Sequence, residues 1–259
     1  MHRTDIQPAF TSIWHAEGGF EGLWKREGQL YKRVKERRTL RFMHGDRAFF
    51  IKIHAGVGWK EIFKNLLVLK LPVIGAKNEY DAIRHLTRIG VPTLTLAAYA
   101  ERGINPASLR SFVITEDLGE SLSLEHFCRD WGRSPPDFKL KRALIEEVAQ
   151  IARRMHESGA NHRDFYICHL LRRHADERLY VIDLHRAQLR RRLPQRWRIK
   201  DLAALYFSAM DIGLTRRDLL RFISYYRAQP LSQIFPREHS FWRRVEIRAQ
   251  RLHRSPIRR

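Results

Sequence analysis

The sequence predicts an α+β fold with a small β-rich N-terminal lobe and a larger, mainly helical C-terminal lobe. Strand-like runs bounded by turn residues lie between residues 28 and 116, and long helical patterns follow residue 117. A chain of 259 residues is also long enough to bury a substantial core. Residues 1–27 carry scattered aromatic side chains and are expected to form a packing strap. The predicted divisions are therefore 1–27, 28–116 and 117–259, within one domain overall.

Composition limits the partners and the compartment. Lys and Arg number 49 against 28 Asp and Glu, a formal net charge of +21, so a polyanionic partner is expected: nucleic acid, anionic lipid or a phosphorylated glycan. The 44% hydrophobic and 11% aromatic content exclude a disordered chain. Two cysteines suit a reducing compartment, and no apolar run has the length of a signal peptide or a membrane span. We therefore expect a soluble protein on the cytoplasmic side.

Lys52 is a charged residue inside the apolar, strand-like run 48–53. An ammonium buried in such a strand needs an anionic partner, whereas a surface lysine does not. A helix is expected at about 76–89, because apolar residues recur on one face and Gly90 and Pro92 follow it. Glu79 lies in its first turn, where it either pairs with Lys52 or only complements the helix dipole.

Two further features belong to the N-terminal lobe. Strands are expected at 93–100 and 111–115, and the hinge that begins with Glu116 is placed to meet an adenine edge with its backbone. Between 57 and 76, apolar residues recur at helical spacing from Trp59 to Leu67 and are flanked by lysines. That stripe either lies in a membrane interface or packs on the protein core.

In the C-terminal lobe, the chain is expected to turn helical from Ser121, with a break at 134–136. A long amphipathic helix then runs through Met155, and a short strand at 179–182 ends at Asp183. Asp201 is expected to open a later helix at its cap position, and a basic helix begins near Arg237.

The chemistry is carried by His162-Arg163-Asp164, between the long helix and the short strand that ends at Asp183. A strand lysine, a helix glutamate, an HRD loop and a later aspartate are, in this order, the parts of a kinase site. Asp164 would accept or orient the proton of a substrate hydroxyl. Asp183 would bind the Mg²⁺ that bridges the ATP phosphates, and Lys52, held by Glu79, would contact those phosphates.

The chain departs from the protein-kinase pattern at three places, the third being Leu184 and His185 after Asp183 instead of Phe-Gly. No G-x-G-x-x-G loop joins the first strands, and Arg37 or Arg38 is the candidate to contact the phosphates instead. His169 stands where protein kinases have a metal-binding Asn. Because Mg²⁺ prefers oxygen ligands, His169 either binds the metal or only hydrogen-bonds Asp164 or a phosphate.

A basic run follows Asp183. Residues 186–200 contain seven basic side chains and no acidic one. Since guanidinium groups bind phosphate and carboxylate bidentately, this run is predicted to bind an acidic acceptor rather than to be a solvated loop. The candidate substrate-binding residues are Arg186, Arg190, Arg191, Arg192, Arg196 and Arg198.

The chain resembles the protein-kinase superfold and, more closely, the WaaP/RfaP family of lipopolysaccharide core heptose(I) kinases. The strings that carry the likeness are 50–54 (FIKIH), 58–66 (GWKEIFKNL), 71–79 (LPVIGAKNE) and 162–169 (HRDFYICH), and it covers roughly residues 20–250. The resemblance implies ATP- and Mg²⁺-dependent phosphorylation of the first heptose of the inner core. It further implies a peripheral location at the cytoplasmic face of the inner membrane and acyl carrier protein as a partner. In kinase-like folds an aspartate at the place of Asp201 holds the backbone of the catalytic loop.

Two alternatives remain open at this level. A kinase of the same fold acting on Kdo, a second heptose or protein hydroxyls would keep every catalytic residue. The other alternative is a basic, non-catalytic nucleic-acid-binding protein, but nucleic acid is not expected as the partner because the sequence shows no base-stacking or RNA-binding signature.

Overall fold

The computed structural model describes residues 2–34, 37–56, 58–59, 63 and 75–254. The chain divides into two compact units. The first, here the β-rich unit, contains Met1–His85, Leu94–Gly119 and Leu184–Arg186. The second, the helical unit, contains Leu86–Thr93, Glu120–Asp183 and Ala187–Arg259. The predicted fold class is confirmed, and the first 27 residues belong to the β-rich unit.

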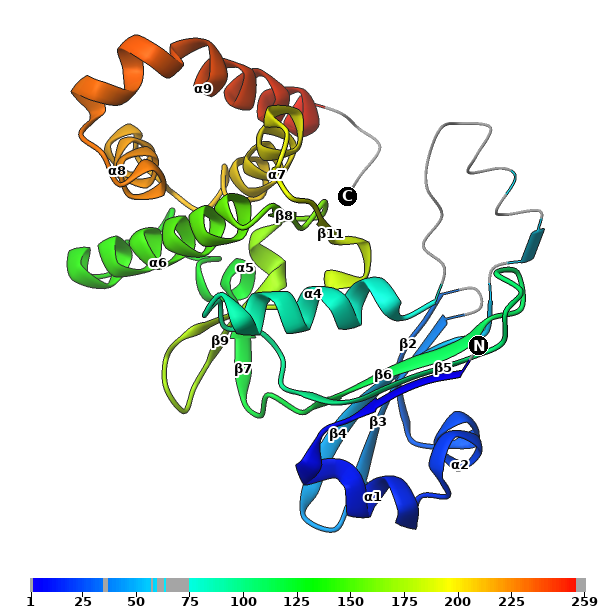
Figure 1. Cartoon of the computed structure of the whole chain (residues 1–259). Coiled ribbons are helices and arrows are strands. Elements are labelled where there is room, and N and C mark those ends of the chain that lie inside the picture. The colour runs from blue at the N-terminus through cyan, green and yellow to red at the C-terminus, as the bar shows by residue number, and fades with distance from the viewer. Residues whose placement is uncertain (1, 35–36, 57, 60–62, 64–74, 255–259) are drawn as a thin grey trace. The chain divides into compact units, whose positions relative to one another are not determined.

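A six-stranded antiparallel sheet forms the β-rich unit (Figure 1). Lys52 lies on a central strand of it, because β4 pairs with β3 on one side and β6 on the other. The strands, in their order across the sheet, are β1 (His2–Ile6), β5 (Leu96–Arg102), β6 (Arg110–Glu116), β4 (Arg47–His54), β3 (Arg37–His44) and β2 (Gln29–Val34).

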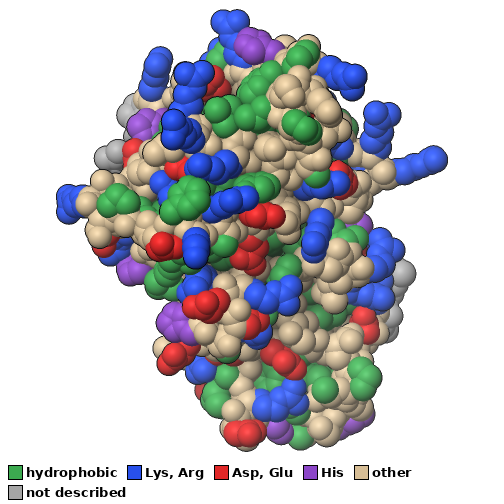
Figure 2. All heavy atoms as spheres, turned by 90° about the vertical axis from the view of Figure 1, so that its left-hand side faces the viewer, with side chains coloured by type: hydrophobic (Ala, Val, Ile, Leu, Met, Phe, Trp, Pro, Cys, Tyr) green, Lys and Arg blue, Asp and Glu red, His purple; other side chains and the backbone are tan. Residues whose placement is uncertain are grey.

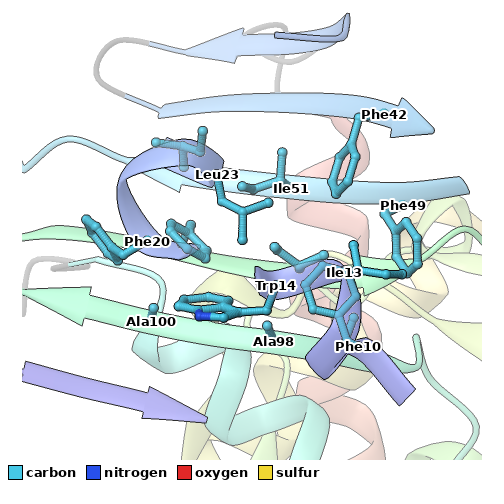
Figure 3. Close-up of a cluster of buried hydrophobic side chains, with 14 of the residues drawn as sticks. Phe10, Ile13, Trp14, Phe20, Leu23, Phe42, Phe49, Ile51, Ala98 and Ala100 are labelled. Carbon is cyan, nitrogen blue, oxygen red and sulfur yellow. The ribbon is translucent and has the colours of Figure 1, made fainter. Parts of the chain in front are cut away.

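The core of this unit lies beneath the N-terminal segment, on one face of the sheet. The 3-10 helix η1 (Pro8–Phe10), α1 (Thr11–Ala16) and α2 (Gly19–Lys25) bring Phe10, Trp14, Phe20 and Leu23 against it, as Figure 3 shows. All four side chains are at most 8% exposed. The predicted strap therefore supplies core side chains. Its first residues, however, pair as strand β1 with β5, which its scattered aromatic pattern did not predict.

Helix α4 (Lys77–Arg88) follows closely the helix predicted at 76–89. Its buried face carries Tyr80, Ala82, Ile83 and Leu86, each 1% exposed. Gly90 adopts a positive φ of 70° just beyond the helix, the left-handed conformation expected of a C-terminal glycine.

The helical unit is built on α6 (Phe138–Glu157), against which α8 (Arg216–Arg227) packs, while α9 (Leu231–Arg254) packs on α7 (Gln195–Ser208). Ser121 begins a short strand rather than a helix, because β7 pairs with β9 and the helix starts only at Leu124. The smaller elements are β7 (Ser121–Ser123), α5 (Leu124–Phe127), β8 (Ala160–Asn161), η2 (Ile167–His169), β9 (Leu170–Arg173), β10 (Leu179–Val181) and β11 (Gln188–Leu189). The 3-10 helix η3 (Leu184–Arg186) follows β10 in the chain and belongs to the β-rich unit.

Of the predicted apolar stripe from Trp59 to Leu67, most lies outside the described residues. Trp59 and Phe63 are described; they are 50% and 57% exposed and their rings stack at 5.8 Å. Lipid contact by this stripe stays a prediction. Within the described residues, no helix has the length and apolar character needed to cross a bilayer. Figure 2 shows Lys and Arg side chains spread widely over one face of the molecule, with acidic side chains among them.

Candidate active site

The β-rich unit holds the predicted Lys52–Glu79 pair. Lys52 Nζ lies 2.5 Å from Glu79 Oε1, and the pairing joins β4 to the first turn of α4. The Glu79 side chain is 1% exposed, whereas that of Lys52 is 24% exposed. The buried carboxylate therefore fixes the lysine, whose side chain is partly exposed. Of the two roles that the sequence allowed Glu79, pairing with Lys52 is confirmed.

The helical unit holds the His162–Arg163–Asp164 segment, anchored from below by Asp201. Asp201 Oδ2 accepts the backbone N–H of His162 at 2.7 Å, and Oδ1 accepts that of Arg163 at 2.9 Å. Arg163 has a φ of 74°, a left-handed conformation that is costly for a residue with a Cβ. The two charge-assisted hydrogen bonds help to offset that cost. Asp201 thus holds the loop backbone, as the resemblance implied.

The predicted helix-cap position of Asp201 is wrong. Helix α7 begins at Gln195, after Pro194, so Asp201 lies inside the helix and is fully buried. Its carboxylate is directed at the loop instead of at the helix's own first N–H groups. The last basic residues of the run, Arg196, Arg198 and Lys200, already lie in α7.

His162 is a buried connector rather than a group open to substrate. It is 0% exposed, and its Nε2 lies 2.9 Å from the carbonyl oxygen of Ile182. Since a carbonyl oxygen only accepts, Nε2 carries the proton. Burial lowers the pKa of His162, which keeps the ring neutral. The ring stacks on that of His169 at 5.6 Å, so this histidine links the HRD loop to the strand end before Asp183.

His169 faces Asp183 across the same loop. Its Nδ1 donates to the backbone carbonyl of Asp164 at 2.7 Å, which leaves Nε2 directed at Asp183 Oδ2, 3.6 Å away. The backbone N–H of Ile182 donates to the His169 carbonyl at 3.0 Å. Asp183 has a φ of 58°, a strained conformation that Asp tolerates better than most residues. Asp164, His169 and Asp183 are therefore brought together in the helical unit.

These groups fit Mg²⁺ through Asp183. The ion is commonly bound by one or two carboxylates plus phosphates and water, and Asp183 supplies a hard oxygen ligand whose side chain is 24% exposed. His169 is less suited, because imidazole is a softer ligand, although its Nε2 faces the Asp183 carboxylate. No cluster of three or more His, Cys, Asp or Glu suited to a metal occurs among the residues that the structure describes.

The other predicted ATP-contacting residues lie in the β-rich unit with structural contacts of their own. The Arg38 guanidinium donates to the carbonyl of Trp24 at 2.6 Å. Arg37 pairs in register with His54 on β4, and Glu116 forms an ion pair of 2.7 Å with Arg47. ATP contact by Arg37, Arg38 or Glu116 stays a prediction.

Comparisons with known proteins identify the family. The model of the lipopolysaccharide kinase (Kdo/WaaP) family matches residues 21–226. The chain belongs to this family. It is 49% identical over 258 residues to the lipopolysaccharide core heptose(I) kinase WaaP of Pseudomonas aeruginosa, covering 97% of this chain and 96% of that one. To the WaaP of Escherichia coli K12 it is 43% identical over 254 residues, with 96% of each chain covered.

A solved structure extends the likeness to the fold. WaaP in complex with acyl carrier protein superposes with a TM-score of 0.82 at 44% identity, covering 97% of this chain and 99% of that one. As a lipopolysaccharide kinase of this family, the chain is a phosphotransferase, which confirms the enzyme predicted from the HRD motif.

In this family member the basic run is divided between the two units. Arg186 lies in the β-rich unit, and the other basic residues lie in the helical unit. Arg191, Arg192 and Arg196 are exposed, whereas Arg190 is half-buried. Arg198 lies near Tyr226, since its charge acts to lower the pKa of that tyrosine, which burial raises to about 12. Substrate binding by these arginines stays a prediction.

Sequence reasoning missed several residues that support this kinase's catalytic loop. His156 is 1% exposed and lies between Tyr226 and Asp201. Ser208 Oγ accepts the backbone N–H of Ile167 at 3.0 Å. Trp197 contacts several cations of the basic run. A lone aromatic ring inside an arginine-rich segment was a readable signal for Trp197, whereas the sequence carries no comparable signal for His156 or Ser208.

Proposed function

We propose that this kinase transfers the γ-phosphoryl group of ATP to heptose I of the lipopolysaccharide inner core. One observation carries the proposal: Asp201 holds the His162–Asp164 loop while His169 joins Asp164 to Asp183. Heptose I is proposed as the acceptor because two relatives that match over nearly their whole length are named heptose(I) kinases.

The proposed roles follow from the contacts. Asp164 accepts the proton of the heptose hydroxyl as that oxygen bonds to the γ-phosphorus and the bond to the leaving oxygen of ADP breaks. Lys52, fixed by Glu79, contacts the ATP phosphates, and Asp183 binds Mg²⁺. When bound, Mg²⁺ neutralises charge on the phosphate oxygens. Each of these residues acts by position and charge, which is where most of the barrier reduction in phosphoryl transfer arises.

The location and the partner belong to the same proposal. A chain with a net charge of +21 is attracted to the anionic cytoplasmic face of the inner membrane, where the acceptor glycolipid is made. Acyl carrier protein is a proposed partner, supported by the solved WaaP structure that contains it and by the strong basic charge of this chain.

The test follows transfer of labelled γ-phosphate from ATP with Mg²⁺ to inner-core lipopolysaccharide that lacks its heptose phosphate. Wild type is compared with Asp164→Asn, a near-isosteric change that removes the base, and both are checked for folding by thermal melting. We expect transfer by wild type and a loss of at least a thousandfold in the variant. Equal rates would reject Asp164 as the base. Wild-type transfer only to Kdo, to a second heptose or to protein would reject heptose I as the acceptor.

A further inference from the structure

Four cationic side chains of the helical unit converge on one indole ring. The guanidinium carbons of Arg163, Arg190 and Arg196 lie 5.8, 5.1 and 5.4 Å from the centre of the Trp197 ring. Lys200 Nζ lies 5.4 Å from it. We call Arg163, Arg190, Arg196, Lys200 and Trp197 the indole cluster. Cation–π attraction holds each charge near the ring but does not remove the repulsion among the charges.

The repulsion is visible at Arg190. Burial lowers the pKa of its guanidinium, and the neighbouring charge of Arg196 lowers the pKa further, while the Asp201 carboxylate acts in the opposite direction to a smaller extent. The N-terminus of α7 adds positive potential at the same place, because Arg196 and Trp197 lie in its first turn. That turn contains no acidic residue, and Pro194 supplies no side-chain cap. An anion bound here would relieve both the crowding and the uncapped helix end.

The cluster is rigidly supported. Arg190 Nη1 donates to Asn161 Oδ1 at 2.5 Å, and its Nη2 donates to Gln188 Oε1. The backbone N–H of Arg190 donates to the Gly159 carbonyl at 3.0 Å, and a Cβ at Gly159 would come within 1.8 Å of the Arg190 carbonyl oxygen. Only glycine permits this approach. Arg190 is therefore positioned by the backbone before any ligand arrives, which reduces the entropic cost of binding.

One buried donor of the cluster and one of the residue that supports Arg190 have no hydrogen-bond partner among the described residues. They are Trp197 Nε1 and Asn161 Nδ2. Asn161 is fully buried, and its amide adjoins the Arg190 guanidinium through Oδ1. Buried donors without acceptors are costly, and here they occur beside several cations. An oxyanion would give these two donors an acceptor and would add negative charge beside four cationic side chains.

The cluster is also coupled to the catalytic loop. Trp197 and Asp201 are four residues apart on α7 and so lie on one face of the helix. Asp201 accepts the backbone N–H of Arg163, and Trp197 contacts the Arg163 guanidinium. The residue immediately before Asp164 is thus held at both ends by one turn of α7. A ligand at the indole ring would lie close to the hydroxyl-activating residue.

We propose that the indole cluster binds an oxyanion, a phosphate or a carboxylate, carried by the acceptor glycolipid. The identity of that carrier rests on the proposed function. The proposed site includes only some residues of the basic run. Arg190 and Arg196 belong to it, together with Arg163 and Lys200 from outside the six predicted arginines, whereas Arg198 lies toward Tyr226.

The first experiment measures acceptor kinetics for Arg196→Gln, an exposed position whose loss leaves the fold intact. Arg217→Gln, another exposed charge, on α8, is the matched control. We expect Arg196→Gln to raise the acceptor KM about tenfold with the ATP KM unchanged. For an acceptor whose phosphates are removed and whose carboxylates are esterified, wild type should show the same high KM as the variant. An unchanged acceptor KM in Arg196→Gln would overturn the proposal.

The second experiment does not depend on turnover. Tryptophan fluorescence is followed while inorganic phosphate, and separately the acceptor, is added without ATP. We expect a saturable change in wild type and in Arg217→Gln, its loss in Trp197→Phe, and a midpoint about tenfold higher in Arg196→Gln. No change in wild type with either ligand would overturn the anion site. A response to phosphate that the acceptor neither reproduces nor competes with would overturn its assignment to the acceptor.

The two experiments also distinguish failure of this inference from failure of the proposed function. Absence of phosphoryl transfer to heptose I, together with acceptor binding that Arg196→Gln weakens, would reject the reaction and retain the site. Transfer to heptose I with an unaltered KM in Arg196→Gln would retain the reaction and reject the site.

Discussion

His156 Nε2 lies 3.5 Å from Oδ2 of Asp201, the same oxygen that accepts the backbone N–H of His162. His156 Nδ1 lies 2.9 Å from the hydroxyl of Tyr226, so a buried chain of polar groups runs from α8 through α6 to the catalytic loop. His156 and Asp201 are 1% and 0% exposed. The anchor of the loop is thus itself positioned from beneath by side chains that touch no substrate.

Substitution of a residue in this series of buried polar groups should lower turnover, because the catalytic loop 162–164 becomes less firmly held. We expect Asp201→Asn to lower kcat about a hundredfold, because the amide can accept only one of the two backbone N–H groups. His156→Phe should lower kcat about tenfold with little change in the ATP KM, since the loop is loosened but not released. Steady-state kinetics and melting curves measure both. A normal kcat in a well-folded Asp201→Asn would show that the loop does not need this anchor.

The Lys52–Glu79 pair should separate activity from stability. Lys52→Met leaves the Glu79 carboxylate buried without its cation, so we expect unfolding to become easier by about 2–4 kcal/mol and kcat to fall at least a hundredfold. In Lys52→Met with Glu79→Leu, the lost stability should return and the activity should not. Urea unfolding and transfer assays decide this. Recovery of activity in the double variant would argue against a role for Lys52 in catalysis.

The metal role of His169 can be tested against the residue that protein kinases have there. If Nε2 binds the metal with Asp183, His169→Asn should keep activity and lower the Mg²⁺ concentration for half-maximal rate, because an amide oxygen suits Mg²⁺ better. His169→Ala should raise that concentration about tenfold. Titration of the rate with Mg²⁺ and with Mn²⁺ gives the answer. Identical Mg²⁺ curves for all three proteins would restrict His169 to its hydrogen bond with the Asp164 carbonyl.

His54 should make the fold sensitive to acid. Burial, with the charges of Arg37, His185 and Lys52, lowers the pKa of His54 to about 3 in the folded protein, against an ordinary value of 6.5. Between these values the unfolded chain binds the proton more readily. Stability is therefore full above about pH 6.5 and should fall by up to about 1.4 kcal/mol per pH unit below it.

The measurement is urea unfolding at pH 7, 6 and 5 for wild type, for His54→Leu, which removes the titrating group, and for His15→Gln, an exposed control. We expect a shallower pH dependence in His54→Leu alone, whatever its stability at pH 7. The same slope in all three proteins would contradict the assignment.

Local patterns in the sequence predicted much of the fold and part of the site. The 3.6-residue repeat with Gly90 and Pro92 placed α4 nearly to the residue, and the charge inside an apolar strand predicted that Lys52 needs an anionic partner. Asp201 shows the limit. Its capping preference suggested a helix start, but a contact to residues 162 and 163, almost forty positions earlier, determines its place. The prediction of a helix from Ser121 was wrong for a similar reason, because strand β7 forms by pairing with β9, a distant segment of the chain.

The pairing of β1 with β5 imposes a delay on folding during synthesis. His2 is matched with Arg102, and every strand of the sheet except β6 is made before β5 is complete. At roughly 5–20 residues per second, the first strand waits on the order of 5–20 seconds for its partner to be translated. During that interval the apolar side chains of α1 and α2 have only an incomplete sheet to cover. Because β5 joins β4 only through β6, the nascent chain is expected to depend on chaperones until β6, which ends at Glu116, has left the ribosome. It is also expected to depend on the speed of translation up to that residue.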